Sequence, residues 1–217
     1  MLTGAFAIIA DPLGRVTGET NSVVALTTEG RILDRYDKAH LVPYGEYLPM
    51  RPLLETIGLS QLAPGQGDIS YGPGPATMTL PGWGKVGLQV CYEIIFSGKV
   101  VDRNDRPDFI FNPSNDAWFG RWGPPQHLAQ ARLRAAEEGL PVIRSTPTGI
   151  SAIVDARGRI ISSLPWRTAG VINGTIPSPT SRFTPFGCVG NVIPLSLAAL
   201  LIIAAIALSS RQRYRAT

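Results

Sequence analysis

The sequence predicts a layered α/β domain that is followed by one C-terminal transmembrane helix. Short apolar strands occur both in hairpins, with turns at Gly30 and Gly158, and in alternation with helical segments, which is the pattern of an α/β layer architecture. Residues 189–208 carry no charge, and a helix of this length, at about 1.5 Å per residue, covers roughly the 30 Å hydrocarbon core of a bilayer. The 217 residues therefore suffice for one domain with a sizeable core, residues 1–180, and a membrane segment.

The start of the chain is predicted to be strand-rich. The first ten residues have no basic segment and no small-residue cleavage site, so they do not read as a signal peptide. Apolar runs bounded by turn residues predict strands at residues 2–9, 22–28 and 31–36.

A Pro- and Gly-rich stretch, residues 49–81, follows and predicts a loop with one short helix. Four apolar residues share one face of that helix, namely Met50, Leu53, Leu54 and Ile57. Two interpretations stay open: a surface helix packed on the domain, or a lid whose apolar face contacts lipid.

The second half of the chain predicts two helices among strands. The first runs from Cys91 to about Asn104, and the second begins at Pro124 or Pro125 and ends at Glu138 before Gly139. In the second helix Leu128, Ala131 and Ala135 mark the packed face, and Arg134 and Glu138 form an i,i+4 pair. Strands are predicted at residues 86–90, 108–112, 141–146, 150–155 and 159–164.

Charge and cysteine content exclude several functions. The net charge is +4, but Arg211, Arg213 and Arg215 form a C-terminal cluster, and without these three the 20 basic residues fall to 17 against 16 acidic ones. That balance does not indicate a nucleic-acid-binding protein. Cys91 and Cys188 show neither metal-ligand spacing nor the density of a disulfide framework, so we expect no metal and no cofactor.

Cys91 is the candidate nucleophile. Val86, Leu88 and Val90 alternate with Gly87 and Gln89, so the strand predicted here brings Cys91 to its end. A thiol at a strand end, followed by main-chain N–H groups that turn into a helix or loop, has the geometry of a nucleophile beside an oxyanion hole. The alternative is structural, because a single cysteine in an apolar run is usually a small core residue.

Three sequence motifs, one of which contains Cys91, resemble those of a known protein family. Lys38-Ala-His-Leu-Val-Pro-Tyr-Gly-Glu46-Tyr-Leu-Pro, the Cys91-Tyr92-Glu93 block and Asn115-Asp116-Ala117-Trp118-Phe119-Gly120 together resemble the apolipoprotein N-acyltransferases, the membrane-bound branch of the nitrilase (carbon–nitrogen hydrolase) superfamily. The motifs occur in the family's order over most of the chain. The resemblance implies the α-β-β-α sandwich of the nitrilases.

The resemblance also implies roles for individual residues. Cys91 is the nucleophile, Lys38 and the main-chain N–H groups after Cys91 stabilise the oxyanion, and Glu46 orients the lysine and the incoming amine. Supporting or substrate-binding roles fall to Tyr92, Glu93, Asn115, Trp118 and Phe119. His40 and His127 are the two histidines of the sequence, so a Cys/His dyad would use one of them; the Lys/Glu arrangement explains more.

By resemblance the reaction is an acyl transfer from a phospholipid, through a Cys91 thioester, to the N-terminal lipid-modified cysteine of a lipoprotein. Two alternatives remain: a membrane-tethered amidase or nitrilase-type hydrolase, and a non-catalytic fragment. The implied location is a bacterial inner membrane, with the domain outside and the basic tail, residues 209–217, in the cytoplasm, because positive charges favour the cytoplasmic side.

The family also has several preceding membrane helices and a Trp-Pro-Glu segment with the general-base glutamate. Neither occurs in these 217 residues. We therefore expect the chain to be a C-terminal fragment, inactive and not exported when expressed alone.

Overall fold

Two β-sheets form the body of the protein in the computed structural model, which describes residues 1–58 and 68–215. The first sheet is antiparallel, in the order β1 (Leu2–Ala10), β2 (Val16–Leu26), β3 (Ile32–Asp37). The second has six strands in the order β4 (Thr77–Leu80), β5 (Gly84–Leu88), β6 (Phe109–Pro113), β7 (Val142–Ser145), β8 (Ser151–Val154), β9 (Ile160–Leu164). Strands β5, β6 and β7 are parallel, and the flanking pairs are antiparallel.

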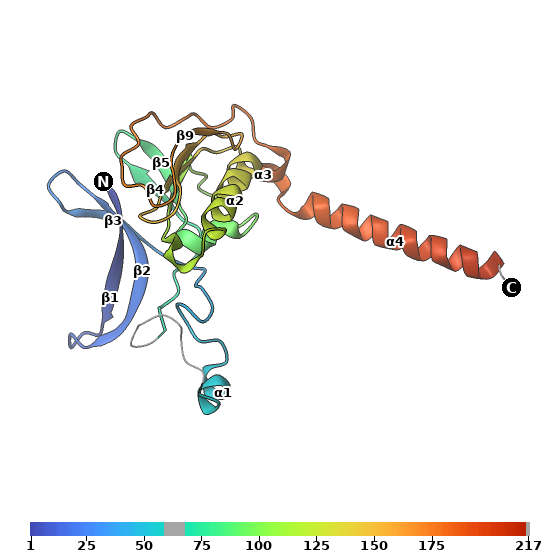
Figure 1. The fold of residues 1–217 in the computed structure, drawn as a ribbon, viewed down its shortest axis with the longest axis horizontal. Helices are drawn as coiled ribbons and strands as arrows, with labels where there is room; N and C mark the ends of the chain where they lie inside the picture. Colours follow the sequence, from blue (N-terminus) through green and yellow to red (C-terminus); the bar gives the residue numbers. More distant parts are fainter. Residues whose placement is uncertain (59–67, 216–217) are drawn as a thin grey trace.

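Helices lie between the strands in sequence or follow them. They are α1 (Arg51–Thr56), α2 (Gly123–Glu138), α3 (Pro185–Val189), α4 (Val192–Arg215) and the 3-10 helices η1 (Cys91–Ile95) and η2 (Asp116–Trp118). Helix α2 packs beside the six-stranded sheet, whereas α1 and α4 lie away from the two sheets (Figure 1). Helix α2 has prolines in its first turn, where no N–H is needed, and ends at Gly139 with φ 65°. It ends at the predicted Glu138 and starts at Gly123, one residue before the predicted Pro124.

The core has two parts, one on each side of the six-stranded sheet. Between the two sheets pack residues from both, among them Val23, Tyr36, Met78, Val86, Leu88 and Phe109. Between the six-stranded sheet and α2 pack a second set, among them Ile94, Ile110, Leu128, Ala131, Ala135 and Val142. The layer order is therefore three-stranded sheet, six-stranded sheet, α2, which are three of the four layers of an α-β-β-α sandwich.

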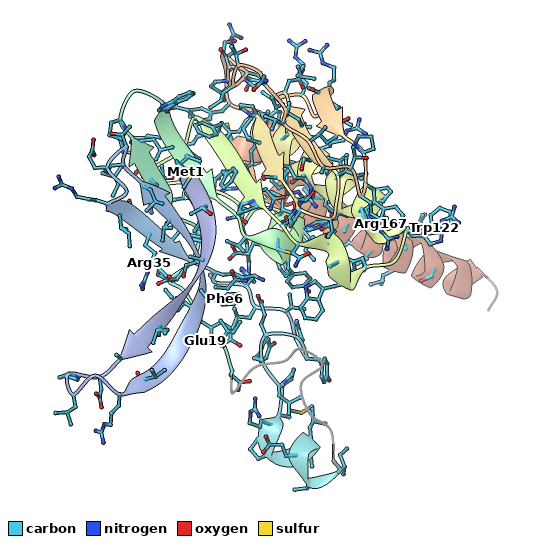
Figure 2. All side chains as sticks on the ribbon, turned by 60° about the vertical axis from the view of Figure 1, so that its left-hand side comes forward. Met1, Phe6, Glu19, Arg35, Trp122 and Arg167 are labelled. Atoms are coloured by element: carbon cyan, nitrogen blue, oxygen red, sulfur yellow. The ribbon has the colours of Figure 1, made fainter. Side chains whose placement is uncertain are left out.

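The hairpin of β1 and β2 is long, and Figure 2 shows its tip projecting beyond the body of the domain. Its tip carries the Asp11–Arg15 ion pair, at 2.8 Å, and also exposes two apolar side chains: Leu13 is 77% and Val16 is 68% exposed. On β1, Phe6 and Ile8 are exposed, while Ala5 and Ala7 between and beside them are partly buried. The three-stranded sheet thus buries one face against the second sheet and leaves the other open within the described residues.

Several predicted details differ from the structure. The helix predicted to run from Cys91 to about Asn104 is only η1, a single 3-10 segment, because the chain bends repeatedly after Ser97. Arg134 pairs with Glu137 at 3.1 Å and not with Glu138, whose side chain instead meets Arg106 at 3.0 Å. Strand β4 is additional to the predicted set. The predicted short helix is α1, and residues 59–67 of the loop around it lie outside the described residues.

Among the described residues, α4 is a helix that is long enough and apolar enough to cross a membrane, judged by its length and composition alone. Its apolar window is Val192–Ser209, with a mean hydropathy of 2.6 and no residue buried in the domain. Figure 1 shows it leading away from the body. It begins three residues after the start of the predicted span, since Val189 closes α3 and the chain turns at Gly190, φ 59°.

Candidate active site

Cys91 occupies a strained turn just after strand β5, the second strand of the six-stranded sheet. The strand stops at Leu88, and Cys91 opens η1 with φ 52°, a left-handed conformation that is unfavourable for a residue with a side chain. The thiol is partly buried, and its Sγ lies 3.9 Å from the main-chain oxygen of Asn115. A non-glycine residue in this conformation at a strand-to-helix turn is typical of a nucleophile presented to a substrate.

The main-chain N–H groups after Cys91 are not equivalent. The N–H of Glu93 donates to the Val90 oxygen at 3.2 Å inside η1. The N–H of Tyr92 falls at the second helical position, where a 3-10 helix offers no internal acceptor. Of the two, the Tyr92 N–H is therefore the donor suited to an oxyanion.

Lys38 follows strand β3 and is 1% exposed. Its Nζ donates to both carboxylate oxygens of Glu46, at 2.8 and 2.7 Å. Glu46 also accepts from Asn21 Nδ2 at 2.9 Å and from the Val42 N–H at 2.8 Å. The lysine is thus a buried ammonium whose position is fixed by a carboxylate, and that carboxylate is itself fixed by β2 and by the loop after Lys38.

Glu93 joins the lysine loop to the cysteine turn. Its side chain is buried, and its two oxygens accept four hydrogen bonds, from Tyr36 Oη at 2.9 Å, Ala39 N–H at 2.8 Å, His40 N–H at 3.0 Å and Val90 N–H at 2.7 Å. Ala39 and His40 follow Lys38 directly, and Val90 precedes Cys91. One carboxylate therefore brings the backbone beside Lys38 and the backbone beside Cys91 within hydrogen-bonding distance of the same two atoms.

The donor from Tyr36 remains a neutral phenol. Burial, followed by the charge and the hydrogen bond of Glu93, raises the pKa of Tyr36 far above its ordinary value. The Oη–H group consequently stays protonated and donates at any physiological pH. A buried carboxylate with four neutral donors is satisfied without a cationic partner.

A second buried polar cluster lies behind the cysteine. Asp116 at the start of η2 forms an ion pair with Arg144 Nη2 of β7 at 2.8 Å, and both side chains are fully buried. Asp116 Oδ1 also lies 2.8 Å from His127 Nδ1, and His127 Nε2 lies 3.0 Å from the main-chain oxygen of Cys91. Burial would raise the pKa of Asp116, but the hydrogen bond with His127 and the charge of Arg144 outweigh it and hold that pKa below its ordinary value.

The geometry excludes His127 as the base of a Cys/His dyad. A carbonyl oxygen only accepts hydrogen bonds, so the Nε2 that faces the Cys91 oxygen carries a proton. That nitrogen is engaged by the main chain of Cys91 rather than by its Sγ. His40, the other histidine, stacks on Phe96 with ring centroids 4.4 Å apart.

The remaining predicted residues line the surroundings of the turn. The side chain of Asn115 caps η2, where its Oδ1 accepts from the Ala117 N–H and from Thr148 Oγ1, both at 3.1 Å. Trp118 is 60% and Phe119 is 46% exposed, and the Phe119 ring lies edge-on to His127. Tyr92 packs edge-on against Phe96. The structure thus gathers these predicted residues around one turn, while their roles remain predictions.

Both cysteines carry free thiols; Cys188 in α3 is exposed. Among residues 1–58 and 68–215 no group of three His, Cys, Asp or Glu side chains is arranged to hold a metal ion.

Sequence reasoning did not assign Tyr36, Asp116, His127 or Arg144 to the site. One signal was available, because Arg144 is the single charged residue in the apolar run Pro141 to Ser145, and a charge in a buried strand needs a buried partner. The partners themselves come from η2 and α2, whose positions the local sequence does not reveal.

Comparison with known proteins identifies the family. The carbon–nitrogen hydrolase family matches residues 8–186. The chain is 40% identical over 207 residues to an apolipoprotein N-acyltransferase of Bradyrhizobium diazoefficiens, covering 94% of this chain and 38% of that protein. It is 46% identical over 156 residues to an apolipoprotein N-acyltransferase of Allorhizobium ampelinum, covering 71% of this chain and 30% of that protein.

The chain thus spans less than two fifths of the length of these relatives. Among solved structures, Saccharomyces cerevisiae Nit3, a member of branch 10 of the nitrilase superfamily, matches with a TM-score of 0.49 and 21% identity, covering 75% of this chain and 55% of that chain. The family match covers the turn at Cys91 and both sheets, apart from residues 2–7 of β1. The chain belongs to the carbon–nitrogen hydrolase family.

Proposed function

We propose that this chain carries the reaction centre of an N-acyltransferase that moves an acyl chain from a phospholipid to the N-terminal amine of a lipid-modified lipoprotein. The observation that carries the proposal is Cys91 in a left-handed turn, tied through Glu93 to the loop of a buried Lys38–Glu46 pair. The named relatives support the acyl-transfer chemistry. The exposed apolar helix α4 supports substrates that reside in a membrane.

The reaction has two steps, the acylation of Cys91 and the transfer of the acyl chain to the amine. In the first, Cys91 Sγ attacks the ester carbonyl of the phospholipid, the C–O bond breaks, and the thiol proton ends on the departing lysophospholipid hydroxyl. In the second, the amine attacks the thioester, a C–N bond forms, the C–S bond breaks, and a proton from the amine restores the thiol. The Lys38 ammonium and the Tyr92 N–H stabilise the oxyanion of each tetrahedral intermediate.

The test uses a chimera in which this chain replaces the matching segment of the Bradyrhizobium protein. Supplied with a phospholipid that carries a labelled acyl chain, the chimera should bind label at Cys91 as a hydroxylamine-sensitive thioester. A diacylated lipopeptide should then discharge the label and give triacylated product. Cys91→Ala should bind none, while Cys188→Ser, the matched control at the second free thiol, should label fully.

Two outcomes would change the assignment. Label retained by Cys91→Ala would remove Cys91 from the mechanism. Discharge by water at the same rate with and without the lipopeptide would favour a membrane-tethered amidase or nitrilase-type hydrolase, which uses the same residues with water as the acceptor.

Lys38 is tested by a substitution that keeps its charge. Lys38→Arg in the chimera should lower the acyl-transfer rate roughly 10²-fold or more, which is the effect of losing one oxyanion donor, because a planar guanidinium cannot occupy the site of a buried compact ammonium. A near-normal rate would show that Lys38 acts only as a distant charge.

We also propose that the 217 residues alone transfer acyl chains too slowly for turnover. The three carboxylates tied to this site, Glu46, Glu93 and Asp116, are all engaged with donors, and a positioned general base contributes typically about 10²- to 10⁴-fold. Mass spectrometry of the purified chain in detergent, with phospholipid and lipopeptide, should show far less acyl-Cys91 and product than the chimera. Equal product would mean that one of these carboxylates is the base, with Glu46 and Glu93 the first to mutate.

We propose that α4 spans the inner membrane, with the domain outside and the arginine-containing end in the cytoplasm. Cys188 in α3 is exposed and lies just before α4, so it reports the side of the domain. In whole cells that express the chimera, a membrane-impermeant maleimide should label Cys188 once the outer membrane is permeabilised. Labelling that requires lysis of the inner membrane would reverse the orientation.

A further inference from the structure

The main-chain oxygen of Cys91 contacts a series of buried polar side chains that the reaction as proposed does not use. His127 of α2 donates from Nε2 to the Cys91 main-chain oxygen at 3.0 Å. Its Nδ1 lies 2.8 Å from Asp116 Oδ1 and 3.0 Å from Arg144 Nη2. His127 is 7%, Asp116 1% and Arg144 2% exposed, so the whole chain of groups is shielded from water.

The turn that this hydrogen bond reaches is the strained one. Cys91 has φ 52°, which a residue with a Cβ adopts only when its surroundings impose it. Its carbonyl group is the part of the residue that His127 contacts, so the bond bears directly on the peptide orientation. Changing that orientation would rotate both the carbonyl oxygen and the next N–H, that of Tyr92, since the two belong to one planar peptide unit.

The groups that hold His127 are rigidly placed. Arg144 Nη1 also donates to Asn112 Oδ1 and to Ser114 Oγ, which tie it to β6 and the residue after it. Gly149 packs against Asp116 so closely that an added Cβ would lie 2.1 Å from Asp116 Oδ2. Through its bonds to Asp116 and to β6, Arg144 of β7 therefore ties the imidazole to the six-stranded sheet.

We infer that His127 is a positioning residue for the nucleophile: through its hydrogen bond to the Cys91 oxygen, and anchored by Asp116 and Arg144, it holds the turn that presents the thiol and the Tyr92 N–H. The inference rests on the proposed function only in taking Cys91 as the nucleophile. It assigns His127 no proton transfer to the substrate.

Two amide substitutions separate this role from simple packing. The side-chain nitrogen of glutamine reaches about as far as Nε2 of histidine, so His127→Gln retains a donor for the Cys91 oxygen. Asparagine is shorter and reaches about as far as Nδ1, so His127→Asn keeps the polar contact with Asp116 but loses the carbonyl bond. Both are neutral, polar and no larger than histidine, which makes them a matched pair for a buried site.

The readout is the alkylation of the thiol by iodoacetamide in the 217-residue chain in detergent, followed by peptide mass spectrometry. Exposed Cys188 is an internal reference in each sample, and near-ultraviolet circular dichroism reports whether each variant folds. We expect His127→Asn to change the alkylation rate of Cys91 relative to Cys188 roughly 10-fold or more, because small displacements of a reacting group have effects of that size or larger. His127→Gln should stay within about 3-fold of the parent chain on the same scale.

Two results would overturn the inference. One is an unchanged Cys91 rate in folded His127→Asn, which would show that the carbonyl bond does not set the thiol geometry. The other is an equal change in both variants, which would make the histidine a packing residue. The alkylation needs no lipid, so failure of acyl transfer in the chimera would refute the proposed function and leave this result standing.

Discussion

Two buried carboxylates stabilise the turn at Cys91, and they differ in the charge of their partners. Glu93 accepts hydrogen bonds from a phenol and three main-chain N–H groups. Asp116 is paired with a guanidinium and an imidazole. The first carboxylate connects two backbone segments directly, whereas the second acts on the backbone only through the side chain of His127.

The difference shows how one site can use two ways of burying an anion. Neutral donors satisfy Glu93, with no direct cationic contact among the side chains that the structure describes. Each donor comes from a segment that must be aligned with the others. The charge of Asp116 is compensated by the opposite charge of Arg144. The ion pair has no net charge, but each partner then depends on the other. Loss of Glu93 should therefore affect alignment, and loss of Asp116 should affect folding.

Asp116→Ala tests the second half of this comparison and should have the largest effect. Removing one partner leaves the Arg144 guanidinium buried without its carboxylate, so the free energy of unfolding should fall by about 3–5 kcal/mol. Urea unfolding of the chain in mild detergent, followed by tryptophan fluorescence, measures the change. Asp116→Leu with Arg144→Met, which removes both charges, should recover a large part of the loss; a double variant as unstable as the single one would argue against charge dependence.

Glu93→Gln tests the first half and should have an intermediate effect on stability. An amide keeps the shape but turns one accepting oxygen into a donor that faces a main-chain N–H, so we expect a loss of about 1–3 kcal/mol. In the chimera the same variant should also lower the acyl-transfer rate, because the Lys38 loop and the Cys91 turn lose their common anchor. A stability loss without any change in rate would contradict the alignment role.

Tyr36→Phe removes only one of the four donors to Glu93 and should cost about 1 kcal/mol. The ring still fills its place between the sheets, where it is 3% exposed. The same urea unfolding experiment applies. A loss as large as that of Asp116→Ala would show that the phenol is more important than the three main-chain donors.

The smallest effect is the acid dependence of the Asp116 cluster. Against the opposing effect of burial, His127 and the ion pair with Arg144 hold the pKa of Asp116 below its ordinary value in the folded chain, so its contribution to stability is fully present above the unfolded pKa and is lost as the pH falls through the folded one. A carbon-13 NMR titration of the Asp116 carboxyl should give a lower midpoint in the folded chain than in the urea-unfolded chain. A midpoint at or above the unfolded value would contradict the ion pair.

Local sequence was enough to locate much of the fold and to nominate the candidate site residues. Helix α2 could be predicted with both ends, since proline in the first turn and glycine after the last act within one turn of the chain. The apolar run that became α4 is recognisable because membrane length and charge are properties of a continuous segment. Cys91, Lys38 and Glu46 stand in motifs whose order the sequence displays.

Tertiary structure alone decided how these residues are held. Glu93 reaches Tyr36 and Ala39 across 57 and 54 residues of chain, and His127 reaches Cys91 across 36. The hydrogen-bond partner of a polar side chain cannot be read from the sequence at such separations, because the bond forms only when packed sheets and helices bring the two residues together. The same reason explains why Arg134 pairs with Glu137 and not with Glu138. The helical spacing permits either pair, but in the folded chain Glu138 pairs with Arg106.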